Sequence, residues 1–140
     1  MKLSIKVAMI AATVILLSAT SVFAQTSRIR IHVPFAFDAG NTHLPAGDYR
    51  VAKDTLFQWV VLEKEGGSTI FLTTHRPFTG GTMKENGALT FDKYGDKYFL
   101  RKFSTPGTGA GYEWPMSRAE REIAKTGVPG EVASVEAGTK

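Results

Sequence analysis

The chain has 140 residues, 43% of them hydrophobic, with 17 basic and 13 acidic side chains and no cysteine. This length suits a single domain, and the lack of cysteine excludes disulfides, zinc–thiolate sites and cysteine nucleophiles. A net charge of +4 is too small to indicate a nucleic-acid or anionic-lipid partner.

The first 24 residues have the pattern of a cleaved signal peptide. Lys2 and Lys6 begin it, a long uncharged stretch follows, and Val22-Phe23-Ala24 places small residues where a signal peptidase cuts. An uncleaved membrane anchor is the alternative, because the uncharged stretch reaches the lower limit for spanning a bilayer, about 17 residues. Cleavage near Ala24 leaves 116 residues with a net charge of +2 and no second long apolar segment. We therefore expect a periplasmic or secreted protein whose mature form does not span a membrane.

Residues 28–37 give the clearest structural pattern, because apolar residues alternate there with polar or small ones. Period-two alternation predicts a strand with one face in a core. Pro34 cannot donate to a strand ladder, which favours an edge or a bulge. Turns at 38–41 and 44–48 follow, then a strand from Tyr49. Strands at 57–62 and 69–74 are separated by a glycine-containing turn, as in a hairpin.

The second half begins with residues 75–87, which are polar and contain proline and glycines, as in a loop. A second hairpin is expected over 89–103, followed by a mobile loop at 105–111. Ser117 and Glu120 then have the spacing of a capping box, which predicts a short helix to about Lys125.

This order of elements predicts a mainly β domain over residues 25–126. We expect a small antiparallel barrel or sandwich of about six strands with one short C-terminal helix. A barrel that spans a membrane is disfavoured, since it needs at least eight strands of about ten residues. Residues 127–140 are small and polar without periodicity, so they are predicted to form a disordered tail.

Four stretches carry a family resemblance: VPFAF at 33–37, LPAGDYRV at 44–51, LTFDKYGDKYFL at 89–100 and WPMSRAERE at 114–122. Together they resemble a family of small exported β-rich proteins that is abundant in Acidobacteria. The resemblance covers most of residues 31–123 and implies an exported β-rich domain, without supplying catalytic residues. The chain departs from the family pattern at Ala36, where a polar residue is expected, and at Trp114, where an aliphatic one is.

No motif for metal or nucleophilic catalysis is present. Metal sites need histidines or carboxylates at workable spacing, which is lacking among the three histidines, His32, His43 and His75. The Gly-x-Ser-x-Gly elbow of serine hydrolases is missing. The glycines of 107–111 lack the strand–loop–helix context of a phosphate loop.

Two carboxylate pairs have residue types that acid–base catalysis uses. Asp92 and Asp96 are better explained by the turn between them, and Glu120 and Glu122 by a helix cap and a solvated helix face. We therefore expect no catalytic residues, no metal and no cofactor, and a protein that is not an enzyme.

Six residues remain as candidate contacts with a ligand or partner. Aromatic residues in loop-like segments often make such contacts, and these are Phe78, Tyr112 and Trp114. The polar face of the first strand carries a basic stripe, Arg28, Arg30 and His32. Such a stripe can meet an anionic polysaccharide, or protect an edge from aggregation.

The expected function is a non-enzymatic β domain that binds an apolar small molecule or a partner protein in the cell envelope, since the mouth of a barrel is a usual ligand site. One alternative is an envelope structural or assembly protein that acts by edge-strand pairing. The other is a hydrolase whose site is assembled across loops.

Overall fold

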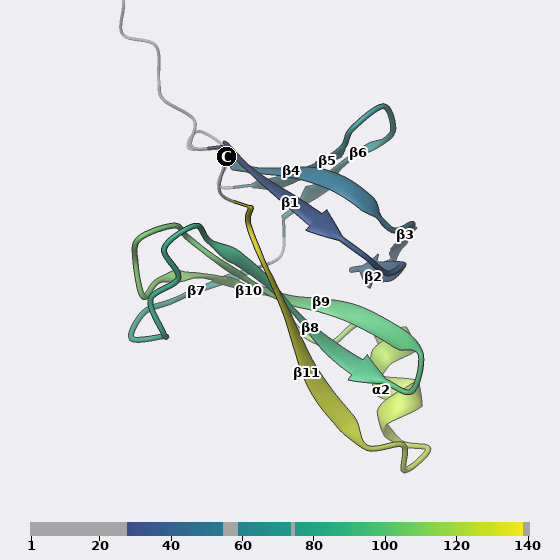
Figure 1. Ribbon diagram of the computed structural model, residues 1–140. Helices are drawn as coiled ribbons and strands as arrows, with labels where there is room; N and C mark the ends of the chain where they lie inside the picture. The colour runs from purple at the N-terminus through teal and green to yellow at the C-terminus, as the bar shows by residue number, and fades with distance from the viewer. Residues whose placement is uncertain (1–27, 55–58, 74, 139–140) are drawn as a thin grey trace, which may run out of the picture.

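The computed structural model describes residues 28–54, 59–73 and 75–138, so the predicted signal peptide lies outside the described residues. These ranges form eleven strands and one helix, α2 (Figure 1). The protein is mainly β, with antiparallel and mixed sheets arranged as a half-barrel and one short helix near the C-terminus, which confirms the predicted fold class. Within the described ranges, no helix has the length and apolar character that crossing a membrane requires.

The first sheet has four antiparallel strands. Their order is β1 (Arg28–Val33), β4 (Gly47–Lys53), β5 (Val60–Lys64) and β6 (Thr69–Leu72). Ile31 lies opposite Tyr49, and Val51 lies opposite Leu62. All four side chains are buried, so the alternation seen in the sequence puts one face of this sheet in the core.

The second sheet is larger and mixed. Its strand order is β11 (Gly130–Glu136), β8 (Ala88–Tyr94), β9 (Lys97–Ser104), β10 (Gly111–Glu113) and β7 (Arg76–Phe78). The hairpin of β2 (Phe37–Ala39) and β3 (Thr42–Leu44) joins it where Asp38 pairs in parallel with Phe99 of β9. One edge of β9 is therefore shared between β10 and β2, and this division creates the candidate site described below.

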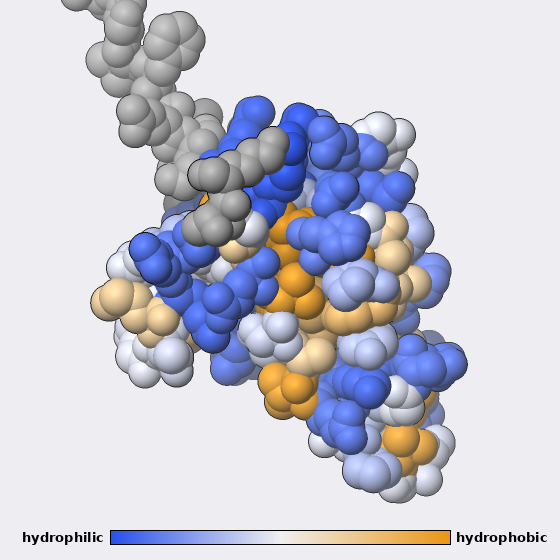
Figure 2. Space-filling view, viewed as in Figure 1, coloured by the Kyte–Doolittle hydropathy of each residue, from blue (hydrophilic) through white to orange (hydrophobic). Residues whose placement is uncertain are grey.

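Aromatic side chains fill the space between the sheets. The Phe37 ring packs edge-to-face against Tyr49 and Phe91, with centroids 5.3 and 5.1 Å apart, and Phe35 stacks on Tyr98 at 3.7 Å. Such pairs add to the large apolar area that each ring buries. On the side seen in Figure 2, apolar residues also reach the surface between the two sheets, as expected for a half-barrel. With no cysteine in the chain, this core stabilises the fold without disulfides.

The turn before β4 is fixed by Tyr49. Its side chain is buried, and its hydroxyl donates a hydrogen bond to the carbonyl oxygen of Pro45. Burial raises the pKa of Tyr49, so the hydroxyl keeps its proton for this bond. Leu44 is also buried, which explains how the LPAGDY stretch folds as one unit.

Replacing Tyr49 with phenylalanine is expected to lower the free energy of unfolding by about 1 kcal/mol, because the hydrogen bond between the Tyr49 hydroxyl and the Pro45 carbonyl is lost. In a domain of this size, the midpoint of thermal unfolding falls by about 4 °C. The matched control is Tyr112→Phe, whose ring contacts with His75 and Lys53 do not use the hydroxyl. Equal midpoints for the two variants would contradict the role given to Tyr49.

The predicted disordered tail over 127–140 is wrong for residues 130–136, which form β11 and pair with all of β8. Ala133 and Val135 pack against the core, while Val132 points outward and is 75% exposed. The strand was missed because small residues give a weak alternation, and its pairing with β8 comes from a distant part of the chain.

Two predicted loops contain more structure than expected. Residues 76–78 of the first one form β7, which pairs with β10. In the loop at 105–111, the Gly107 amide donates to the Lys84 carbonyl at 2.9 Å, and the Gly109 carbonyl accepts from the Gly81 amide at 2.8 Å. The glycines therefore allow close backbone contacts between two segments.

Candidate functional site

A groove of about 390 Å³ lies beside the outer strand of the first sheet. Three segments line it: the β2–β3 turn at 39–42, residues 70–73 in and after β6, and residues 114–117 between β10 and α2. The groove exists because β10 ends at Glu113, whereas β2 meets β9 at Phe99 only. The backbone between these two pairings leaves a hollow at the edge of the sandwich.

None of the twelve described residues that line this groove carries a charge. Apolar side chains include Ile70, Leu72 and Trp114, and the polar ones include Asn41 and Thr42. A charged group brought here would lose water without gaining an ion partner, which is costly. The groove therefore suits an uncharged ligand that is partly apolar and has hydrogen-bonding groups.

Strand β6 offers a free backbone edge next to the groove. It pairs with β5 on one side, and with no other strand of the described ranges. Phe71 of β6 is 56% exposed and packs edge-to-face with Trp59 at 5.4 Å between centroids. Unpaired backbone N–H and C=O groups along such an edge can accept an additional strand.

Trp114 lines the groove but is not the exposed loop aromatic that we predicted. It is 6% exposed and belongs to the core, because the 114–117 segment is pulled against β9. Its Nε1 is buried without a hydrogen-bond partner among the described residues, and so is Nδ1 of His75, whose ring centroid lies 6.4 Å away. Each such buried group without a partner costs free energy.

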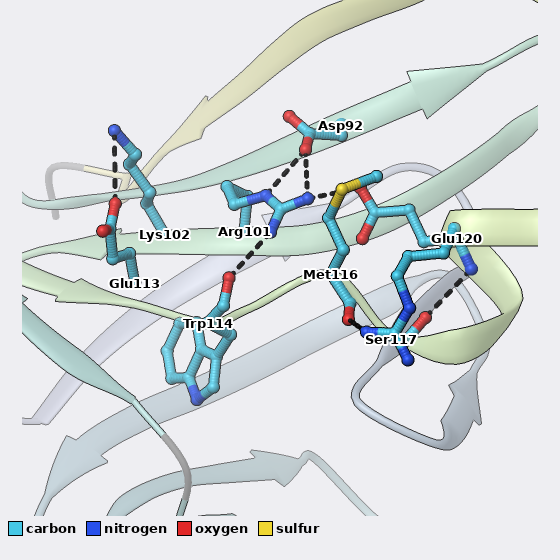
Figure 3. A network of polar contacts seen from close by, with 9 residues as sticks. Asp92, Arg101, Lys102, Glu113, Trp114, Met116, Ser117 and Glu120 are labelled. Atoms are coloured by element: carbon cyan, nitrogen blue, oxygen red, sulfur yellow. Dashed lines mark hydrogen bonds and ion pairs between the residues drawn. The ribbon is translucent and has the colours of Figure 1, made fainter. Parts of the chain in front are cut away.

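One side chain, Arg101 of β9, holds the 114–117 segment and the helix together (Figure 3). Its Nη1 donates to the Trp114 carbonyl oxygen at 2.8 Å. Its Nε donates to Asp92 Oδ2 at 2.7 Å, and its Nη2 donates to Glu120 Oε1 at 2.5 Å. We call Asp92, Arg101 and Glu120 the Arg101 cluster.

The helix α2 (Arg118–Ala124) brings Glu120 into this cluster. The Ser117 hydroxyl accepts from the Glu120 amide at 3.1 Å, which confirms the predicted cap. The Glu120 carboxyl binds Arg101 instead of forming the other half of a capping box, and it is almost fully buried. The interpretation of the Glu120 side chain as half of a capping box is therefore wrong, whereas Glu122 is exposed, as expected for a solvated helix face, and pairs with Lys125 at 3.3 Å.

Two carboxyl groups around one guanidinium leave an excess of negative charge. Burial and a hydrogen bond with Asp92 raise the pKa of Glu120 to about 7, although the Arg101 charge opposes the shift. Burial and the nearby Glu120 also raise the pKa of Tyr94. Below neutral pH the cluster holds one proton, and its single negative charge balances Arg101.

The other predicted contact residues lie apart from the groove. Arg28, Arg30 and His32 are exposed on the outer face of β1. Arg30 shares Glu65 with Arg50, at 3.6 Å from each, and His32 Nδ1 lies 2.9 Å from Asp48 Oδ1. These ionic contacts are typical of a charged strand face.

Phe78 and Tyr112 are in strands rather than loops, in β7 and β10. Phe78 lines a second hollow of about 470 Å³ together with Arg101 and Lys102, and Lys102 Nζ lies 5.3 Å from its ring centroid. Tyr112 packs edge-to-face on His75 at 4.9 Å. Of the six predicted contact residues, Trp114 is the one that lines the groove.

The described ranges hold no group of three or more His, Cys, Asp or Glu residues able to bind a metal ion. Most groove residues were not predicted, because Asn41, Ile70 and Ser117 have ordinary local explanations as turn, strand and cap. Besides Trp114, the described residues of the groove include one aromatic residue, Phe71, whose exposure only the structure shows.

Comparison with known proteins adds no relative to this picture. No family model, curated protein or solved structure matches the chain. The resemblance over residues 31–123 stays a prediction, and the function has to be inferred from the chemistry of the groove.

Proposed function

We propose that this protein is an exported, non-enzymatic binding domain, and that its groove receives an extended, uncharged segment of a partner protein in the cell envelope. The main support for this proposal is the free edge of β6, which lies beside a groove with uncharged walls. The predicted signal peptide indicates the compartment, which is the periplasm or the outside of the cell.

Both the backbone and the side chains of an extended peptide fit this site. Its backbone can pair with β6, whose four residues span about 13 Å. Its side chains alternate between two faces, so one set enters the groove near Ile70 and Leu72 while the other lies beside Phe71. Main-chain hydrogen bonds then give affinity, and the groove selects side chains that are uncharged.

A small apolar molecule is the second candidate for the same groove, because about 390 Å³ is within the range of small-ligand pockets. The free strand edge favours the extended segment, since a small apolar molecule leaves the backbone groups of β6 unused. Native mass spectrometry distinguishes the two. Detection of a small bound mass that is lost on denaturation would show that the groove holds a small ligand instead of a peptide.

The first experiment maps what contacts β6 in cells. Benzoyl-phenylalanine, a photoreactive analogue, replaces Phe71 in the full chain produced in its own host, and crosslinked peptides are identified by mass spectrometry. We expect crosslinks to one segment with alternating, uncharged side chains. The control places the analogue at Val132, which is exposed on β11, and is expected to spare that segment. Equal crosslinking from both positions would contradict the proposal.

The second experiment measures binding directly. A synthetic peptide with the sequence of the crosslinked segment is titrated into purified protein by calorimetry. Thr42→Asp puts a charge in the groove and is expected to weaken binding at least tenfold, because the carboxylate loses water without gaining a partner. Val132→Asp adds the same charge on the second sheet and is expected to bind like the wild type. Equal affinities for the two variants would exclude the groove as the site.

A further inference from the structure

Arg101 ties the groove wall to both the second sheet and the helix. Its guanidinium bonds the Trp114 carbonyl at one end of the 114–117 segment and Glu120 just beyond the other end. The backbone adds a further link, since the Trp114 amide donates to the Arg101 carbonyl at 2.9 Å. The wall therefore depends on the position of Arg101, which in turn depends on the two carboxyl groups.

The charged and titratable groups that face Glu120 come from two strands. Asp92 and Tyr94 belong to β8 and Arg101 belongs to β9, while the helix supplies the Ser117 hydroxyl to the backbone of Glu120. Arg121, on the same helix, is directed to the Met116 carbonyl at 2.8 Å. With one proton on the carboxyl pair, Arg101 and its partners are neutral in sum. Without it, two carboxylates repel each other around one cation.

We propose that Arg101 is the positioning residue of the groove, and that the proton on Glu120 determines how firmly Arg101 holds the 114–117 wall and α2. This inference rests on the proposed function only for the identity of what the groove binds, because the exchange protection of the wall can be measured without a ligand.

The direction of the pH effect follows from linkage. The pKa of Glu120 is about 7 in the closed wall and returns toward its ordinary value of 4.5 when the wall opens and the carboxyl is hydrated. Opening therefore releases a proton between about pH 5 and pH 7, and rising pH favours it in that window. Above pH 7 the carboxyl is ionised in both states, and the effect levels off.

The experiment is hydrogen–deuterium exchange of the full chain from pH 5 to pH 8, with the intrinsic rates corrected for pH. In the wild type, the protection of residues 114–125 is expected to fall by up to tenfold per pH unit between pH 5 and pH 7 and then stay constant. Glu120→Gln keeps the shape and a hydrogen-bond donor without the titration, so its profile is expected to be flat. The matched control, Glu122→Gln, removes an exposed carboxyl from the same helix and is expected to follow the wild type.

A flat wild-type profile, or an unchanged slope in Glu120→Gln, would overturn the inference. Failure of the proposed function gives a different result. If the crosslinked peptide binds at no pH while the protection still depends on Glu120, the groove is not a peptide site but Arg101 still controls its wall. If the peptide binds and the protection profile is flat, the proposed function stands and the inference falls.

Discussion

Replacing Arg101 with methionine is expected to lower the free energy of unfolding by about 3–5 kcal/mol at pH 7. The substitution keeps much of the side-chain volume but leaves Asp92 and Glu120 without their cation, and the Trp114 carbonyl without its donor. Breaking a buried ion pair costs more than the pair contributes, because the remaining charge is uncompensated. The loss is expected to shrink at pH 5, where Glu120 is protonated and no longer leaves an uncompensated charge.

Urea unfolding followed by circular dichroism measures this change. The control is Lys102→Met on the next residue of β9. The partner of Lys102, Glu113, is 3.7 Å away and half exposed, so the free energy of unfolding is expected to fall by no more than about 0.5 kcal/mol. The triple variant Arg101→Met, Asp92→Asn, Glu120→Gln removes all the charges together and is expected to recover most of the stability. An Arg101→Met protein as stable as Lys102→Met would show that the Arg101 cluster contributes little.

Replacing Gly111 with alanine is expected to cost about 3 kcal/mol, at the upper end of the effects of overpacking. An added Cβ would overlap the Phe103 carbonyl oxygen of β9, which is backbone and cannot turn aside. The pairing of Gly111 with Ser104 would have to open, and β10 leads directly into the groove wall at Trp114. We therefore expect both lower stability and weaker exchange protection of residues 114–117.

Gly138→Ala is the matched control, since an added Cβ there meets no atom within 4 Å. Its free energy of unfolding is expected to stay within about 0.5 kcal/mol of the wild type. Thermal unfolding and urea unfolding compare the two alanine variants under the same conditions. If Gly111→Ala is as stable as Gly138→Ala, β10 does not approach β9 as closely as described.

The fold class could be predicted because its signals are local. The alternation of residues 28–37 identifies β1 by itself, and the turn at Gly95 identifies the β8–β9 hairpin. Strand β11 lacks such a signal, since its outward face carries the apolar Val132 beside Ser134 while the small Ala133 faces inward, and their partners lie about forty residues earlier. Strands formed mainly by long-range pairing are the ones that periodicity misses.

The candidate site was harder to predict because it depends on side chains from three elements. Asp92 and Glu120 lie 9 and 19 residues from Arg101, and each has a sufficient local explanation as a turn or cap residue. A glutamate is rarely buried, and its position three residues after Ser117 already explained Glu120 as a capping residue. The prediction of Trp114 as a contact residue relied on an exposed side chain, whereas the structure shows that it is buried.

The stretches that carry the family resemblance have a structural explanation. Tyr49 fixes the turn in the second stretch, Asp92 lies in the third, and Trp114 and Glu120 lie in the fourth. These are residues of the core and of the Arg101 cluster. The resemblance itself stays a prediction, and the groove residues of β6 lie outside its four stretches.

The uncharged lining of the groove has a consequence for how fast and under what conditions a partner associates. With no charge among its described residues, the groove lacks the means to steer a partner by long-range attraction. Association is then expected near the rate of unsteered encounters, about 10⁵–10⁶ M⁻¹s⁻¹. Both this rate and the affinity are expected to change little with ionic strength, so recognition would continue in surroundings whose salt concentration varies widely.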